Sequence, residues 1–327
     1  MRFVVYGAGA IGGVIGARLF QHGHEVLLIA RGAHAAAIAA DGLRLDDPTG
    51  SAVLPVAVAT APGEAELRGD DVILLAVKSQ HTLTALDALA ATAPPGVAIV
   101  CAQNGVENER VALRRFEHVY AMVVQLPATH LEPGVVMAHS TPVTGILDLG
   151  RHPAGVDATA QEIAAALSAS SLVSTPRPDI WRWKYAKLLA NLGNAAPIVF
   201  GLGTRGEPIV ERAREEGRAA LAAAGIDWTG EKEFSARHGS FVTRHPVAGY
   251  EHVGGSSWQS VERGTGSVEC DYLNGEISLI GRLHGVATPV NDLLARLAGE
   301  VARGQLAAGA TSPDAFEELL GAAASRP

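Results

Sequence analysis

Residues Met1-Arg-Phe-Val-Val-Tyr6-Gly7-Ala-Gly-Ala-Ile-Gly12 decide the fold of the first half of the chain. The apolar residues 2–6 predict a buried strand, and residues 11–22 predict the helix that follows the glycines. In such a loop the first glycine allows a tight turn, the second lets the backbone approach a pyrophosphate, and the third lets helix and strand pack closely. The helix N-terminus adds unpaired N–H groups and a partial positive charge. The stretch therefore predicts a dinucleotide site in which the cofactor contacts Gly7, Gly9, Ala10, Ile11 and Gly12.

Short apolar runs alternate with Ala-rich helical stretches through residues 1–150, which is typical of parallel strands buried on both faces. The expected strands are 3–6, 26–29, 53–58, 72–77, 97–101 and 119–124, and the expected helices are 11–22, 34–40, 82–93 and 107–115. This alternation predicts a doubly wound α/β domain, a Rossmann fold. Residues 134–149 are expected to form further extended segments that cover one edge of the sheet.

Helical periodicity dominates after residue 178, and strand patterns nearly vanish. A helix over 157–168 and a strand over 171–175 come first, followed by expected helices at 181–194, 207–224, 231–244, 268–284 and 291–306. We therefore predict an N-terminal Rossmann domain over residues 1–175 and an all-α C-terminal domain over residues 176–327.

Composition excludes several classes of function. The 327 residues carry a formal charge of -8, which opposes binding to nucleic acid or to an anionic membrane surface. Cys101 and Cys270 are far apart and lack metal-ligand spacing, which is typical of reduced thiols in the cytoplasm. His238, His245 and His252 share a sevenfold spacing, but Pro246 interrupts any helix through them, so we expect no metal site. The expected partner is a small molecule.

The end of the second expected strand selects the cofactor. NAD sites usually place Asp or Glu there to bind the ribose 2′-OH. Arg31 stands at this position instead, and a guanidinium can pair with a 2′-phosphate. The sequence therefore predicts NADP(H) rather than NAD(H).

Two further strand ends carry polar residues toward the same edge of the sheet. Lys78 follows the strand 72–77, where it is able to reach a phosphate or a substrate carboxylate. Asn104 follows the strand 97–101 and is able to hold the nicotinamide ribose or a substrate oxygen. Asn104 precedes a glycine, so ordinary turn chemistry explains it equally well.

One helix of the second half carries polar residues on an otherwise apolar background. Lys187, Asn191 and Asn194 lie at i, i+4 and i+7 and are expected to share a face, opposite a face with Leu188, Leu189 and Leu192. Such residues need partners or a polar ligand, unless the face is simply solvated. Lys184 lies elsewhere on the turn and is expected to be structural.

Downstream segments add a buried acid and a pair of serines. Glu269 is expected to share a helix face with Tyr272 and Leu273, and a buried Glu among apolar neighbours is costly unless it binds something. Residues 254–257 are expected to form a polar loop or a helix start.

The chain resembles the ketopantoate reductase (2-dehydropantoate 2-reductase) family over about residues 2–306. The ordered motifs are GAGAIGG at 7–13, GHEVLLIAR at 23–31, VKSQ at 77–80, QNGVEN at 103–108, K-x-x-x-N at 187–191, SS at 256–257, and VECDYLNGEI followed by HGVATPVN. The resemblance implies a Rossmann domain and a helical domain with the active site in the cleft between them. It also implies reduction of a 2-oxo acid by hydride transfer to its C2 carbonyl.

The resemblance assigns roles residue by residue. Lys187 matches the catalytic lysine, which polarises the carbonyl and donates the proton, and Asn191 matches a substrate-positioning asparagine. Glu269 matches the glutamate that holds the substrate hydroxyl, and Ser257, with Ser256 beside it, matches a serine for the substrate carboxylate. Asn104 matches an asparagine near the nicotinamide. Arg31 and Lys78 match the pair on the 2′-phosphate side of NADPH.

Two departures from the family pattern bear on the substrate. The family often carries a second Asn eight residues after the lysine, but Ala195 stands here and Asn194 comes one residue early. Gly254 occupies a position where some members have Asn. The first expectation is therefore NADPH-dependent reduction of 2-dehydropantoate to pantoate. The alternatives are a paralogous reductase of another 2-oxo acid and a non-catalytic NADP-binding sensor, and a homodimer is plausible for any of them.

Overall fold

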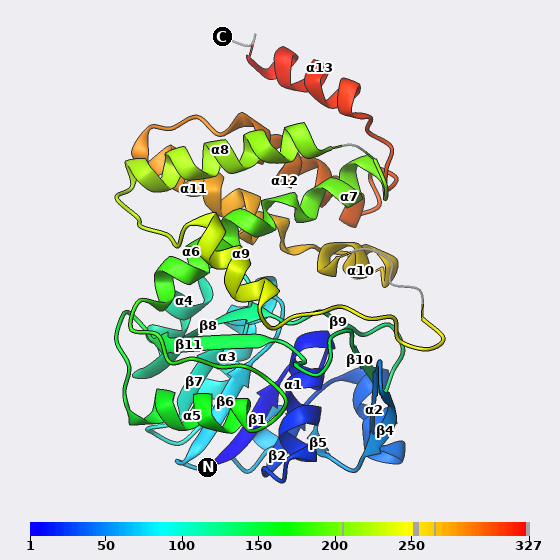
Figure 1. Cartoon of the computed structure of the whole chain (residues 1–327), viewed down its shortest axis with the longest axis vertical. Coiled ribbons are helices and arrows are strands. Elements are labelled where there is room, and N and C mark those ends of the chain that lie inside the picture. Colours follow the sequence, from blue (N-terminus) through cyan, green and yellow to red (C-terminus); the bar gives the residue numbers. More distant parts are fainter. Residues whose placement is uncertain (205, 251–254, 265, 325–327) are drawn as a thin grey trace. The chain divides into compact units, whose positions relative to one another are not determined.

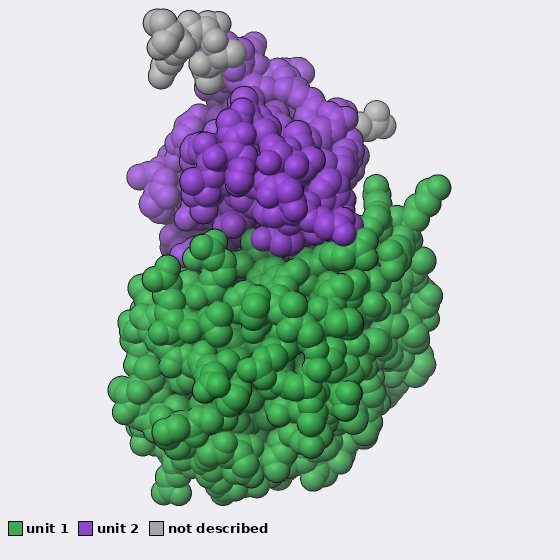
Figure 2. Space-filling view, turned by 90° about the vertical axis from the view of Figure 1, so that its left-hand side faces the viewer, with its two compact units in different colours: residues 1–184, 229–252 green, residues 185–228, 253–327 purple. Residues whose placement is uncertain are grey.

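The computed structural model describes residues 1–204, 206–250, 255–264 and 266–324. Gly254, one of the two departures from the family pattern, and His252 lie outside these residues. Two compact units are present (Figure 2). The first contains residues 1–184 and 229–252, and the second contains residues 185–228 and 253–327. The division falls after Lys184, later than the predicted boundary at residue 175, and a later segment returns to the first unit.

The first unit is built on a seven-stranded sheet (Figure 1). Its order is β11-β8-β7-β6-β1-β2-β5, and every neighbouring pair is parallel except β8 with β11. The strands are β1 (Arg2–Tyr6), β2 (Val26–Ile29), β5 (Ala57–Ala59), β6 (Asp71–Leu75), β7 (Ala98–Cys101), β8 (His118–Gln125) and β11 (Ile146–Arg151). This confirms the doubly wound α/β domain, and β11 confirms the extended segment expected to cover an edge.

Helices bury both faces of this sheet, as the uninterrupted apolar strands require. Phe3 and Val5 pack with α1 and α5 on one face, whereas Val4 packs with α3 and α4 on the other. Asp157 caps α5, because its Oδ1 accepts a hydrogen bond from Ala160 N at 2.9 Å. The helices are α1 (Ala10–Gln21), α2 (Gly32–Asp41), α3 (Thr82–Ala90), α4 (Asn108–Leu113) and α5 (Ala158–Ser168), with 3-10 turns η1 (Pro62–Glu64) and η2 (Ser79–His81).

A smaller four-stranded sheet lies in the same unit. Its order is β4-β3-β10-β9, from β4 (Gly50–Leu54), β3 (Leu43–Asp47), β10 (Val135–Ala138) and β9 (Ala128–Thr129). The predicted single strand over 53–58 is wrong, because Pro55 separates β4 from β5 and the two strands enter different sheets. The predicted strand over 171–175 is also wrong: Val173 and Pro176 make only isolated bridges to β11.

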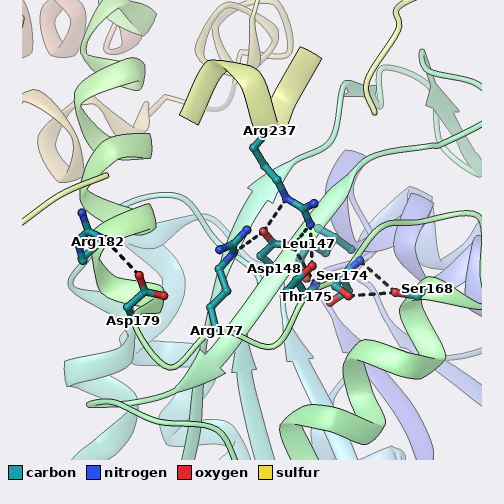
Figure 3. Close-up of polar contacts among 9 residues, drawn as sticks. All are labelled: Leu147, Asp148, Ser168, Ser174, Thr175, Arg177, Asp179, Arg182 and Arg237. Carbon is teal, nitrogen blue, oxygen red and sulfur yellow. Dashed lines mark hydrogen bonds and ion pairs between the residues drawn. The ribbon is translucent and has the colours of Figure 1, made fainter. Parts of the chain in front are cut away.

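Residues 229–252 pack on the first unit, although they follow a stretch of the second in the chain. They include α9 (Glu231–Gly239), which ends earlier than the predicted helix over 231–244. Figure 3 shows the main polar contact: Arg237 donates from Nη2 to Asp148 Oδ1 at 2.7 Å and from Nε to Oδ2 at 3.0 Å. Arg177 Nε reaches the same Oδ2 at 2.7 Å. Two guanidinium groups thus share one carboxylate, whose side chain is 2% exposed.

Changing Asp148→Asn is expected to destabilise the first unit by about 3 kcal/mol, because it leaves two largely buried guanidinium groups without a counter-charge. Hydrogen exchange should show the largest loss of protection in residues 229–252. The matched control is Asp179→Asn, whose ion pair with Arg182 spans 3.4 Å and is about 40% exposed on each side. That change should cost less than about 1 kcal/mol. Unaltered protection of residues 229–252 in Asp148→Asn would show that the carboxylate does not hold the segment.

Helices are the only regular secondary structure among the described residues of the second unit, which confirms the all-α prediction. It contains α6 (Ile180–Asn191, of which the first five residues belong to the first unit), η3 (Leu192–Ala195), α7 (Ala196–Phe200), α8 (Glu207–Ala223), α10 (Ser256–Glu262), η4 (Glu269–Tyr272), α11 (Asn274–His284), α12 (Pro289–Ala302) and α13 (Pro313–Ala324). The predicted helix over 268–284 is wrong in its first turn, because the backbone breaks at Leu273 with φ -117 and ψ -81. Among the described residues, no helix is both long and apolar enough to span a bilayer.

Candidate functional site

The glycine loop follows β1 and leads into α1. Gly7 has φ +103, and a Cβ there would lie 2.8 Å from Val77 N. A Cβ on Gly12 would lie 2.8 Å from Val5 Cγ1, so the predicted close packing of helix on strand requires glycine. A Cβ on Gly9 would meet nothing within 4 Å. Gly9 therefore faces open space beside the N–H groups of Ala10 and Ile11, which is the arrangement that a pyrophosphate needs.

Three of the predicted cofactor residues follow parallel strands that lie on both sides of β1 in the sheet. Arg31 comes after β2 and precedes α2, Lys78 comes after β6, and Asn104 comes after β7. Burial raises the pKa of Tyr6 at the end of β1, and the guanidinium of Arg31 acts in the opposite direction. The sheet thus gathers Arg31, Lys78 and Asn104 at its carboxyl edge, where ligands of such folds bind.

A hydrogen-bond network that sequence reasoning missed joins the loops bearing Lys78 and Asn104. Gln103 Nε2 donates to Val77 O and to Thr82 Oγ1, each at 2.8 Å. Asn108 Nδ2 donates to the backbone oxygen of Asn104 at 2.9 Å. Gln103 and Asn108 belong to the QNGVEN motif, which was the available signal. Their side chains therefore hold the backbone of the loop that carries Asn104.

A buried ion pair connects the same loop with the start of α6. Lys184 Nζ pairs with Glu109 Oε1 and also donates to the backbone oxygen of Gln103 at 3.3 Å. The side chains are 2% and 0% exposed. Burial raises the pKa of Glu109, although Lys184 opposes that shift. The contacts agree with the structural role expected for Lys184.

The second unit positions the predicted catalytic lysine. Lys187 and Asn191 lie one turn apart on α6, as predicted, and Asn191 is buried. The α-helix ends at Asn191, and the chain tightens into the 3-10 turn η3, which includes Asn194. Because side chains three residues apart eclipse in such a turn, Asn194 stays on the side of Asn191, and its place at a shared site stays a prediction. Leu188, Leu189 and Leu192 are buried as predicted.

Glu269 lies on η4 and is 5% exposed. The 3-10 turn keeps Glu269 and Tyr272, which are three residues apart, on one face. The helix predicted to continue through Leu273 is wrong, because the backbone breaks at that residue. The break places Asn274 at the start of α11, where its Nδ2 donates to Leu192 O at 3.1 Å and to Asn291 Oδ1 at 3.0 Å. This fully buried amide links the segment after Asn191 with the segment after Glu269.

The serine pair begins α10, as one of the two readings of residues 254–257 expected. Ser257 is 2% exposed, and its Oγ has no hydrogen-bond partner among the described residues. A buried hydroxyl without a partner is costly, so this atom is suited to a polar ligand. The side chain of Ser256 lies outside the described part of the structure. Within the described residues, no cluster of three or more His, Cys, Asp or Glu side chains is arranged to hold a metal ion.

Family comparisons match both halves of the chain. Residues 3–153 match the family model described as ketopantoate reductase PanE/ApbA, and residues 179–302 match the model of its C-terminal part. A 2-dehydropantoate 2-reductase of Pyrococcus horikoshii is 30% identical over 58% of this chain, and the match spans 61% of that relative.

Solved structures extend the likeness to nearly the whole chain. A PanE/ApbA family ketopantoate reductase from Ralstonia eutropha shares 27% identity with a TM-score of 0.77, covering 93% of this chain and 99% of the other. D-mandelate dehydrogenase with NADH and anilino(oxo)acetate shares 25% identity with a TM-score of 0.80 over the same shares of the two chains. The fold is therefore common to all three.

Proposed function

The chain belongs to the ketopantoate reductase family, and we propose that it reduces 2-dehydropantoate to pantoate with NADPH. The observation that carries the proposal is the pairing of Lys187 and Asn191 one turn apart on α6, in a chain that also has the glycine loop after β1. The first unit binds the cofactor in this proposal, and the helical unit supplies the groups that act on the oxo acid. The protein is then a cytoplasmic oxidoreductase with a small-molecule substrate.

The residues of the second unit have distinct roles in the proposed reaction. The bound nicotinamide supplies a hydride to the C2 carbonyl carbon of the substrate. Lys187 polarises the carbonyl oxygen and donates the proton that turns it into a hydroxyl group. Asn191 positions the substrate oxygen, and Glu269 accepts a hydrogen bond from the substrate hydroxyl. Ser257 binds the carboxylate, a role supported by its buried and unpartnered Oγ; Ser256, Asn194 and Asn104 are further candidates for substrate contacts.

The choice of NADPH over NADH rests on Arg31. Changing Arg31→Ala is expected to weaken NADPH binding by roughly 10–100-fold, because it removes charge-assisted hydrogen bonds to the 2′-phosphate. NADH binding should change by less than about twofold, since NADH lacks that phosphate. Fluorescence titration with both nucleotides measures the two dissociation constants. Arg44→Ala, an exposed arginine of the same unit that pairs with Asp46, is the matched control.

The substrate itself is tested with a panel of 2-oxo acids under saturating NADPH, with NADH run in parallel. 2-Dehydropantoate should give the highest kcat/KM. If it turns over no faster than unbranched 2-oxo acids, the named activity is wrong while 2-oxo acid reduction stands. If no 2-oxo acid is reduced, the reductase proposal fails and an NADP-binding sensor replaces it.

One observation favours a paralogous reductase as the second candidate. Ala195 stands where the family pattern often has an asparagine, so one polar contact to a hydroxylated substrate is missing. D-mandelate dehydrogenase, which has the same fold, acts on an aryl-substituted acid. The panel therefore includes an aryl 2-oxo acid, and a preference for it over 2-dehydropantoate selects this candidate. A homodimer is the assembly we propose, which light scattering of the purified protein measures.

A further inference from the structure

His34 connects the glycine loop with the smaller sheet. It lies in the first turn of α2, and its Nε2 is 2.8 Å from the backbone oxygen of Ala8. Its Nδ1 accepts a hydrogen bond from Gly134 N at 2.8 Å. Because a backbone N–H only donates, Nδ1 is the unprotonated nitrogen, and Nε2 carries the hydrogen that is donated to Ala8. The two contacts together define a neutral imidazole with one tautomer.

The hydrogen bond to Ala8 sets the direction of the next N–H group. The carbonyl of Ala8 and the N–H of Gly9 belong to one planar trans peptide, so they point in opposite directions. Holding the Ala8 oxygen toward His34 therefore aims the Gly9 N–H away from His34. Gly13 leaves room for the Ala8 oxygen in this position, because a Cβ on residue 13 would lie only 2.7 Å from it. A carbonyl turned the other way would present its negative end to an approaching phosphate.

The surroundings of His34 keep the ring neutral and in place. Burial lowers the pKa of His34, and the hydrogen bond to Ala8 only partly opposes the shift. The ring of His130 lies 4.2 Å away between centroids. Gly134 has φ +77, and a Cβ there would lie 3.0 Å from Ala37 Cβ, so its N–H approaches α2 closely.

We propose that His34 is a positioning residue for the dinucleotide pyrophosphate, acting through the Ala8–Gly9 peptide rather than by touching the cofactor. The inference rests on the proposed cofactor site. In this proposal two residues at the start of α2 act on different parts of the cofactor. Arg31 recognises the 2′-phosphate, and His34, three residues later, orients the Gly9 N–H that donates to the pyrophosphate. The two residues therefore differ in which nucleotides they affect.

The test uses three substitutions of His34 in the full chain. His34→Phe keeps the ring shape and removes both hydrogen bonds. His34→Asn carries an amide near the position of Nδ1, so it is able to keep the contact to Gly134 but is too short for Ala8. His34→Gln carries an amide near the position of Nε2, so it is able to keep the donor to Ala8. His24→Gln, whose ring packs edge-on against Phe3 at the opposite end of β1, is the matched control.

Fluorescence titration should show that His34→Phe and His34→Asn weaken NADPH and NADH by the same factor, roughly tenfold, since both nucleotides share the pyrophosphate. His34→Gln should stay within about threefold of the unchanged protein, and His24→Gln within about twofold. Equal factors for the two nucleotides separate this role from that of Arg31. The KM for the oxo acid at saturating NADPH should stay constant.

Three results would overturn the inference: His34→Asn that binds both nucleotides as well as the unchanged protein, His34→Gln that loses as much affinity as His34→Asn, or a loss confined to NADPH. If His34→Phe does not fold, the comparison of the Asn and Gln variants decides the question alone. Failure of the unchanged protein to bind either nucleotide would instead contradict the proposed function.

Discussion

Replacing Lys187 with alanine is expected to lower kcat by about 10²–10⁴-fold, because the proposed reaction loses both the proton donor and the charge that polarises the carbonyl. The dissociation constant for NADPH should change by less than about twofold, since the glycine loop, Arg31 and Lys78 belong to the other unit. Steady-state oxidation of NADPH and fluorescence titration measure the two quantities. Lys187 is half-buried on α6 between residues that pack into the core, so alanine preserves the helix.

Lys232→Ala is the matched control, because Lys232 is exposed on α9. It should keep full activity. Added primary amines should restore part of the activity of Lys187→Ala, since a small ammonium ion is able to donate the missing proton. Full activity in Lys187→Ala would exclude its role as general acid and would favour another proton donor. If the protein without substitutions binds the nucleotide but reduces no oxo acid, the result would favour an NADP-binding sensor.

Changing Lys184→Met is expected to destabilise the protein by about 3–5 kcal/mol, because the carboxylate of Glu109 stays buried without its counter-charge. Urea denaturation followed by circular dichroism measures the free energy of unfolding. Arg68→Met is the matched control: Arg68 and Glu25 form an exposed pair of the same unit at 2.9 Å, with side chains 52% and 56% exposed. That change should cost less than about 1 kcal/mol.

The double variant with Lys184→Met and Glu109→Leu should recover most of the lost stability, since it removes the second buried charge as well. A single variant as stable as Arg68→Met would mean that Glu109 is protonated without cost when Lys184 is gone. Measuring the free energy of unfolding of the variants at several pH values between 5 and 8 tests whether Glu109 is protonated in Lys184→Met. If it is, the loss of stability caused by Lys184→Met becomes smaller at low pH.

Much of the fold was predictable where local pattern and tertiary environment agree. The strands of the central sheet read as continuous apolar runs because both of their faces are buried. Gly7 and Gly12 of the loop have the steric reasons that their spacing already indicated. The errors occur where one residue breaks a pattern. Pro55 ends a strand inside an apolar run, and the backbone at Leu273 interrupts a helical period.

The candidate site was predictable only in the residues that carry functional chemistry on a regular element. Lys187 and Asn191 stood out because a lysine and an asparagine at i and i+4 are unusual on an apolar helix. The contacts that support these residues could not be predicted, because the partners are distant in the chain. Lys184 and Glu109 are 75 residues apart, and Asn274 and Leu192 are 82 residues apart. No local pattern marks such pairs.

The return of residues 229–252 to the first unit has a consequence for biosynthesis. Arg237 leaves the ribosome 89 residues after Asp148, which at 5–20 residues per second is an interval of roughly 5–20 s. During that time Asp148 has Arg177, 29 residues downstream, as its nearer partner in the growing chain. The ion pair between Arg237 and Asp148 therefore forms only after residues 185–228 of the second unit have been synthesised. Residues 253–327 are synthesised later still, so the last segment of the first unit leaves the ribosome between the two segments of the second.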